Sequence, residues 1–440
     1  MTTRDPLNRD ILRLAVPALG ALVAEPLFLI VDAALVGHLG VVPLAGLGIA
    51  GAVLQTIVGL MVFLAYATTP AVARRFGAGE MGSAVRAGID GLWLALGLGA
   101  VLALVGSLAT PTVVGLFGAT AEVAEQAEIY LGISMWGLPA MLIVFAATGL
   151  LRGMQDTVTP LWIAGLGFTA NALLNWLFIY GLGWGIAGSA AGTVVAQWAM
   201  VAAYAVVVQR LAQRHAASVL PHREGVRGSA RSGGWLFLRT VSLRAALLAT
   251  VGVATALGTE ELAGWQVAFT IFSTAAFALD ALAIAAQALI GKSLGAGDER
   301  AVRKVLQRTV AWGGCFGVLV GVVVAAASGV IGLLFTGDPA IAALVQPALL
   351  VLALAQPVCG VVFVLDGVLM GAGDVRYLAI AGGLNLLPFV PALLLVGALQ
   401  PQGAAGLAWL AATFFGVYML ARLATLTWRV RRPQWISAGV

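Results

Sequence analysis

Two acidic residues, Glu25 and Asp32, lie inside the first long apolar stretch of the chain. If this stretch crosses a membrane as a helix, an ionised side chain near its centre costs about 2.5–3.5 kcal/mol, so each carboxylate needs a partner, a water-filled cavity or a proton. Seven residues advance a helix by about 700°, which leaves both carboxylates on one face, about 10 Å apart along the axis. We therefore predict that this face points into the protein and that both acids take part in cation coupling.

The same stretch contains two prolines, Pro17 and Pro26. Each proline removes a backbone donor and presses against the carbonyl four residues earlier, so it kinks a helix. A static kink explains either proline taken alone equally well. Their combination with two intramembrane acids favours a helix that switches between straight and bent forms.

Two asparagines, Asn171 and Asn175, lie one turn apart in a later apolar stretch, at a depth that matches Asp32. We predict that the three side chains form one polar cluster in the outer half of the first six helices, where they bind the coupling cation or substrate. Asparagines also commonly hold membrane helices together, so a purely structural role stays open.

Three charged residues in the second half of the chain fall at similar depth, in the cytoplasmic half of their apolar stretches: Arg244, Asp280 and Asp366. A buried arginine that faces two carboxylates is most simply explained as a structural charge network. A role of this network in coupling or gating is the alternative.

The composition places all these residues in a membrane. The 440 residues are 61% hydrophobic and only 10% charged, and no soluble fold could bury that much apolar surface. A spanning helix needs about 20 apolar residues, and the apolar stretches predict an all-α integral membrane protein of twelve transmembrane helices. We expect the helices at roughly 11–38, 44–73, 84–109, 122–148, 157–181, 187–211, 236–258, 262–292, 301–328, 340–370, 375–397 and 404–430.

The basic residues indicate how these helices are oriented. The chain has 24 lysines and arginines, and on this map each lies on the side of the N-terminus or on a helix that enters from that side. Since short cytoplasmic loops carry an excess of Lys and Arg, both termini are expected in the cytoplasm. The net charge of +5 is then explained by the basic cytoplasmic loops of a membrane protein. We therefore expect the lipid bilayer as a partner and no nucleic acid.

The two halves of the chain are related by an internal repeat with a constant offset. Pro357 lies 218 positions after Pro139, and the same offset aligns turn glycines along both halves. Six helices in each half make a parallel repeat, as in transporters that move one lobe against the other. We predict two pseudo-symmetric six-helix bundles, a first lobe at 1–211 and a second lobe at 236–440, joined by a polar cytoplasmic linker at 212–235.

The cysteines and histidines show no pattern of a metal site. Cys315 and Cys359 lie in apolar spans, where packed thiols are expected, and the three histidines lack the spacing of metal ligands. A membrane enzyme or a receptor would need clustered His, Asp and Glu at a membrane face, or a sizeable domain outside the membrane. We therefore expect no metal, no cofactor and no enzymatic activity.

Five stretches carry a resemblance to a known family: EPLFLIVDAALVGHLG at 25–40, PLAGLGIAG at 43–51, TGLLRGMQDTVTP at 148–160, FALDALAIAAQALIGKSLGAGD at 277–298 and VFVLDGVLMGAGD at 362–374. With the repeat of six helices, the sequence resembles the multidrug and toxic compound extrusion (MATE) transporters over essentially its whole length. Within that family it is most similar to the DinF-like branch.

The resemblance implies two lobes that export amphipathic, often cationic compounds against an inward flow of H⁺ or Na⁺. It makes Asp32 the coupling residue, Pro17 the helix 1 proline, and Asn171 a member of the same polar cluster. The chain departs from its relatives at Asn175, where an aspartate is common, and at Trp265, where a histidine is expected. Loss of one carboxylate weakens a Na⁺ site built from several acids and favours H⁺.

The sequence thus predicts a monomeric secondary transporter in the inner (plasma) membrane. In this hypothesis, protonation of Asp32 bends the first helix and expels an amphipathic drug from a cavity of the first lobe. The alternative is a flippase for lipid-linked precursors from a related superfamily. Such a flippase is expected to carry cationic residues in its central cavity, and the predicted outer halves of the helices contain none.

Overall fold

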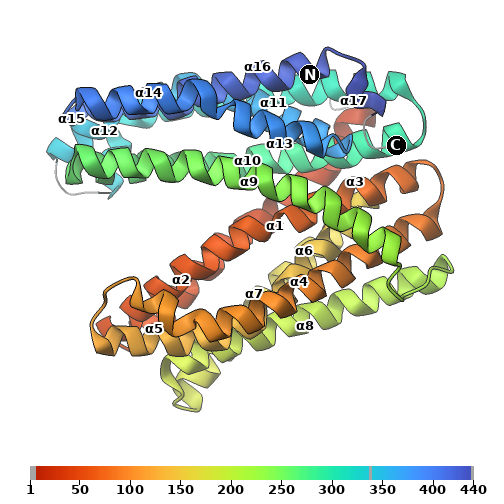
Figure 1. The fold of residues 1–440 in the computed structure, drawn as a ribbon, viewed down its shortest axis with the longest axis horizontal. Coiled ribbons are helices and arrows are strands. Elements are labelled where there is room, and N and C mark those ends of the chain that lie inside the picture. The colour runs from red at the N-terminus through yellow and green to blue at the C-terminus, as the bar shows by residue number, and fades with distance from the viewer. Residues whose placement is uncertain (1–5, 336–338, 438–440) are drawn as a thin grey trace. The chain divides into compact units, whose positions relative to one another are not determined.

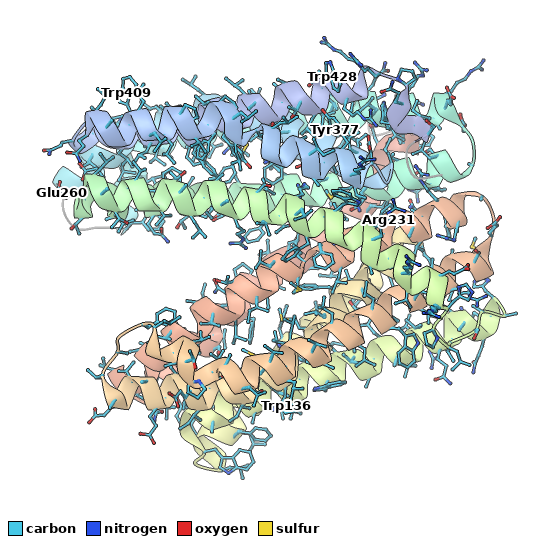
Figure 2. All side chains as sticks on the ribbon, in the orientation of Figure 1. Trp136, Arg231, Glu260, Tyr377, Trp409 and Trp428 are labelled. Atoms are coloured by element: carbon cyan, nitrogen blue, oxygen red, sulfur yellow. The ribbon has the colours of Figure 1, made fainter. Side chains whose placement is uncertain are left out.

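The computed structural model describes residues 6–335 and 339–437, and within them it contains twelve helical spans long and apolar enough to cross a membrane (Figure 1). The predicted all-helical fold with twelve transmembrane helices is therefore confirmed. Without water in the hydrocarbon, a chain this apolar must satisfy its backbone polar groups internally, which helices do. Many large apolar side chains remain exposed on the surface, among them Trp136, Trp409 and Trp428 (Figure 2).

The first six spans are built from eight α-helices and two short irregular segments. These are α1 (Pro6–Gly37), α2 (Val41–Met61), α3 (Phe63–Gly77), α4 (Met81–Gly115), α5 (Ala121–Ser134), η1 (Met135–Gly137), α6 (Leu138–Gly153), α7 (Val158–Trp176), η2 (Leu177–Gly181) and α8 (Gly185–Arg214). The segment η1 separates α5 from α6 just before Pro139, whose missing N–H favours a break in the helix.

The last six spans follow the same order. They comprise α9 (Arg223–Leu257), α10 (Thr259–Gly295), α11 (Glu299–Phe335), α12 (Pro339–Gly371), α13 (Val375–Leu384), α14 (Leu386–Leu399), α15 (Gly403–Ala411), η3 (Ala412–Tyr418) and α16 (Met419–Val430), with a short terminal helix α17 (Gln434–Ser437). Both η2 and η3 are π-helical turns, which are rare and often accompany functional sites.

By its internal contacts the chain divides into two compact units. The first unit is Val16–Gly233, and the second unit runs from Gly234 onward and includes the N-terminal segment up to Ala15. Much of the segment predicted as a linker is helical, because α8 continues to Arg214 and α9 begins at Arg223. The predicted lobe boundaries stay a prediction.

The first unit has a buried apolar cluster to which α1, the helix of Asp32, contributes. Its members include Val36 of α1, Leu131 of α5, Ile179 of η2 and Ala190 of α8. In the second unit the corresponding interior is aromatic, and the ring of Trp265 stacks on that of Phe415 with a centroid separation of 5.5 Å. Trp265 is fully buried there. The tryptophan that stands where a histidine was expected is therefore part of the apolar core.

Candidate functional site

The carboxylate of Asp32 is the centre of a buried polar cluster in the first unit. It accepts hydrogen bonds from three neutral donors: Asn175 Nδ2 lies 2.8 Å and Ser189 Oγ 2.5 Å from Oδ1, and Tyr130 Oη lies 3.0 Å from Oδ2. All four side chains are buried. The donors come from three different helices, so the acid ties α1 to α5, α7 and α8.

Asn171 extends the cluster away from the acid. Its Nδ2 donates to Thr193 Oγ1 at 2.9 Å, and its Oδ1 accepts from Asn175 Nδ2 at 3.2 Å. The structure therefore brings together Asp32, Asn171 and Asn175, as the sequence analysis placed them. Their roles in coupling or binding remain a proposal.

Three members of the cluster were not identified from the sequence: Tyr130, Ser189 and Thr193. Ser189 and Thr193 lie one turn apart on α8, the spacing that drew attention to the two asparagines on α7. Hydroxyl side chains are frequent in membrane helices, and depth alone does not single them out.

Close helix packing holds the cluster in place. A side chain at Gly192 would put its Cβ 2.2 Å from Asn175 Oδ1 and 2.9 Å from the Asn175 backbone nitrogen, so only glycine lets α8 approach α7 here. One turn beyond the acid, Tyr180 Oη donates to the backbone oxygen of Leu35 at 2.7 Å. The C-terminal end of α1 is thus fixed on several sides.

The middle of α1 is packed quite differently. Both prolines lie inside the continuous helix, and no residue from Leu19 to Val31 is buried. Glu25 belongs to this stretch and is exposed, although it shares a helical face with the buried Asp32. The structure therefore does not bring Glu25 into the cluster, because neighbouring helices cover the face at Asp32 and leave it open at Glu25.

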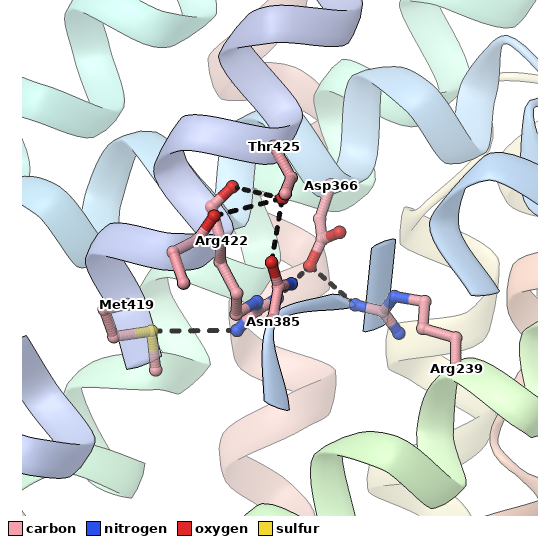
Figure 3. Close-up of polar contacts among 7 residues, drawn as sticks. Arg239, Asp366, Asn385, Met419, Arg422 and Thr425 are labelled. Atoms are coloured by element: carbon pink, nitrogen blue, oxygen red, sulfur yellow. Dashed lines mark hydrogen bonds and ion pairs between the residues drawn. The ribbon is translucent and has the colours of Figure 1, made fainter. Parts of the chain in front are cut away.

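In the second unit, Asp366 on α12 is held by two arginines (Figure 3). Arg239 Nη2 lies 2.6 Å from Asp366 Oδ2, and Arg422 Nη2 contacts the same oxygen. Beside them, Thr425 Oγ1 donates to Asn385 Oδ1 at 3.0 Å. The charge network around Asp366 thus contains Arg239 and Arg422.

The arginine chosen from the sequence needs a correction. Arg244 is exposed on α9, and Arg239 of the same helix takes the place predicted for it. Five residues advance a helix by about 500°, so the two arginines point about 140° apart. Asp280 is half-buried on α10.

A further buried acid, Asp90 on α4, was not considered in the sequence analysis. Its Oδ1 accepts a hydrogen bond from the backbone N–H of His222 at 2.8 Å, immediately before α9 begins. A Cβ at Gly225 would lie 1.9 Å from Asp90 Oδ2, so the first turn of α9 packs directly on this carboxylate. A carboxylate at a helix N-terminus satisfies free N–H groups there. Asp90 thus anchors the segment predicted as a linker.

Comparison with known proteins identifies the family. The family model MatE matches residues 17–177 and 242–394, which is most of the chain and includes both repeats. The chain belongs to the MATE family. Its members are transporters, so the chain is a MATE exporter and not an enzyme.

Individual MATE proteins resemble the chain over most of its length. "Protein DETOXIFICATION 44, chloroplastic" of Arabidopsis thaliana is 29% identical, with 96% of this chain and 82% of the relative covered. "DNA damage-inducible protein F" of Escherichia coli is 28% identical, over 83% of this chain and 81% of the relative. The Vibrio cholerae MATE transporter VcmN in its bent form superposes with a TM-score of 0.87 at 21% identity, covering 98% of this chain and 97% of that one.

Proposed function

We propose that this MATE exporter moves amphipathic, often cationic compounds out of the cell in exchange for H⁺, with Na⁺ as the second candidate ion. The observation that carries the proposal is the Asp32 carboxylate, which is buried in a membrane-spanning bundle among neutral donors. An intramembrane carboxylate without a cationic partner is a typical carrier of protons or metal ions. The names given to relatives, such as DETOXIFICATION, agree with drug-like cargo.

The arrangement of the donors favours H⁺ over Na⁺. Sodium needs several oxygen lone pairs directed at one point, whereas both oxygens of Asp32 already accept N–H or O–H groups. Among the described members of the cluster, Asp32 is the single carboxylate. A proton needs only one of its lone pairs.

In the proposed cycle, substrate occupies the cavity of the first lobe while Asp32 is ionised. Protonation from the outside removes the charge that holds the donors of α5, α7 and α8 on α1. The helix then bends at Pro17 or at Pro26, which lies in the stretch without buried residues, and the cavity shrinks. The related transporter described in a bent form supports such a movement. Coupling requires that proton and substrate favour different conformations.

We place the transporter in the plasma membrane, as a monomer that exports drug-like molecules. A flippase for lipid-linked precursors is not favoured. The described members of the cluster in the first unit carry an acid, amides and hydroxyls, which suit a cation better than a pyrophosphate.

Reconstituted proteoliposomes test the proposal. An imposed pH gradient should drive ethidium transport by the wild type, and Asp32→Asn should lose it by at least about tenfold because the amide cannot take up a proton at this pH. Glu122→Gln, an exposed acid at the outer start of α5, is the matched control and should transport normally. Wild-type transport by Asp32→Asn would refute the role of Asp32, and transport driven only by a Na⁺ gradient would refute H⁺.

A further inference from the structure

The three donors around Asp32 create a problem when the acid gains a proton. In the ionised state each donor points a hydrogen at the carboxylate. A protonated carboxyl group carries a hydrogen of its own, and that hydrogen needs an acceptor. At least one of the three donors must therefore reverse its direction, or a buried hydrogen remains unsatisfied, which is costly.

The three donors differ in their ability to reverse. Asn175 presents its amide nitrogen to Oδ1, and an amide N–H₂ group cannot accept. A hydroxyl group can donate or accept, because its hydrogen rotates about the C–O bond. Asn175 could offer its amide oxygen to the acid only by turning over its amide group, which would break the hydrogen bond from its Nδ2 to Asn171 Oδ1. Ser189 and Tyr130 are therefore the two partners that suit both charge states by rotation of a hydrogen alone, and Ser189 lies nearer to the acid, at 2.5 Å against 3.0 Å.

The two hydroxyls bind different oxygens of the same carboxylate. Ser189 Oγ donates to Asp32 Oδ1 and Tyr130 Oη donates to Asp32 Oδ2. When Ser189 accepts the proton of Asp32, its own hydrogen can turn to the backbone carbonyl one turn earlier in α8, an acceptor that serine hydroxyls in helices commonly use. Rotation of hydroxyl groups thus replaces the charge-assisted hydrogen bonds by weaker neutral ones and leaves no buried hydrogen unsatisfied, and the weaker bonds then let α1 move.

We propose that Ser189 is a positioning residue for coupling: it donates to Asp32 in the ionised state, accepts from it in the protonated state, and so sets the pH at which the transporter changes state. This inference rests on the proposed H⁺ coupling through Asp32. Ser189 of α8 would then set the pH dependence of transport by this protein.

Packing does not explain a serine at this position. Leu407, which lies 218 positions later in the repeat, is fully buried on α15 of the second unit. The fold thus accepts a large apolar side chain at the equivalent place. The hydroxyl in the first unit is present where an acid needs a reversible partner.

The groups that face Asp32 are otherwise neutral at working pH. From α5 the titratable group is Tyr130, while α7 presents Asn171 and Asn175, and α8 adds Thr193 to Ser189. Glu25, seven residues earlier on α1, is exposed. A change of pH response in a Ser189 variant would therefore report on Asp32 and its hydroxyl partners.

The test is the pH dependence of ethidium transport by Ser189→Ala in proteoliposomes. Removal of the hydroxyl takes a donor from the ionised acid and an acceptor from the neutral one. Since hydrogen bonds to a charged group are about twice as strong as neutral ones, the ionised state loses more, and the pH of half-maximal transport should rise by about one unit. Ser189→Thr should restore the wild-type midpoint, and Thr68→Val, which removes another buried hydroxyl of the first unit, should leave it unchanged.

A second measurement keeps the inference testable if Ser189→Ala transports poorly. The infrared carboxylic acid band that disappears in Asp32→Asn can be titrated in purified protein without substrate, and its midpoint should rise in Ser189→Ala and less in Ser189→Cys. Unchanged midpoints by both methods would overturn the role of Ser189. If Asp32→Asn itself transports like the wild type, the proposed function fails instead, whatever Ser189 does.

Discussion

The two six-helix units share one fold but keep their polar groups in different places. The cluster in the first unit consists of Asp32, Tyr130, Asn171, Asn175, Ser189 and Thr193. The second unit has at these positions, 218 residues later, Thr250, Ala348, Phe389, Leu393, Leu407 and Ala411. All six are buried, and five are apolar. The sixth, Thr250, satisfies its hydroxyl on the backbone oxygen of Ala246 at 2.9 Å. The scaffold therefore does not need the polar cluster in order to fold.

At another pair of equivalent positions, the charged groups lie in the second unit and not in the first. In the second unit Asp366 of α12 is paired with Arg422 of α16. In the first unit the equivalent residues are Thr148 and Tyr204, whose hydroxyls lie 3.0 Å apart. One contact of the repeat is thus an ion pair in one unit and a neutral hydrogen bond in the other.

The comparison separates two uses of an intramembrane acid. Two guanidinium groups hold Asp366, so removal of its charge would leave buried cations without their counter-ion. Neutral donors hold Asp32, so it can take up a proton without leaving a cation behind. We infer that Asp366 serves structure and that Asp32 is suited to coupling.

The largest loss of stability is expected when the ion pairs of Asp366 are broken. Asp366→Ala takes away the carboxylate that Arg239 and Arg422 share, and loss of one partner of a buried ion pair typically costs about 3–5 kcal/mol. We expect a marked fall of Tm in detergent and of the amount of protein in the membrane. Glu299→Ala, which removes an exposed acid paired with Arg303, is the control and should change Tm little. A stable Asp366→Ala that fails to transport would instead place this acid in the coupling machinery.

A smaller loss of stability is expected when an acid is placed in the second unit at the position equivalent to Asp32. Thr250→Asp puts a carboxylate among buried apolar side chains without the donors of the first unit, at a cost of about 2.5–3.5 kcal/mol. Thr250→Val keeps the shape without the charge and should be nearly neutral. The difference between the Tm values of the two variants measures the effect of the buried charge on stability. Equal stability of both variants would mean that the second unit also has partners for an acid.

The helices of this chain were predictable because hydropathy reports them directly. The largest error is at α9, which was expected to begin near residue 236 and begins at Arg223. Hydropathy detects only the apolar part of a helix, whereas the polar turns of α9 start where Asp90 binds the chain at His222. This contact joins residues 132 positions apart, which no local pattern reveals.

The sequence showed how deep in the membrane each site residue lies, but not the direction in which its side chain points around the helix axis. Matching depth was enough to join Asp32 with Asn171 and Asn175, because acids and amides are rare in apolar helices. It could not choose between Arg239 and Arg244, which differ mainly in the direction they face. Nor could it select Ser189 among the many hydroxyl residues of the membrane helices.

The smallest effect should come from the neutral pair that replaces the ion pair in the first unit. Tyr204→Phe removes one hydroxyl, and the remaining hydroxyl of Thr148 can turn to a backbone carbonyl of its own helix, so the loss should be about 1 kcal/mol. A double-mutant cycle with Thr148→Val measures the interaction itself. A coupling energy several times smaller than that between Asp366 and Arg422 is expected, since neutral groups lose little when one is removed. Coupling as strong as that of the ion pair would show that this contact stabilises the two units equally, and the units would then differ in the environment of Asp32 alone.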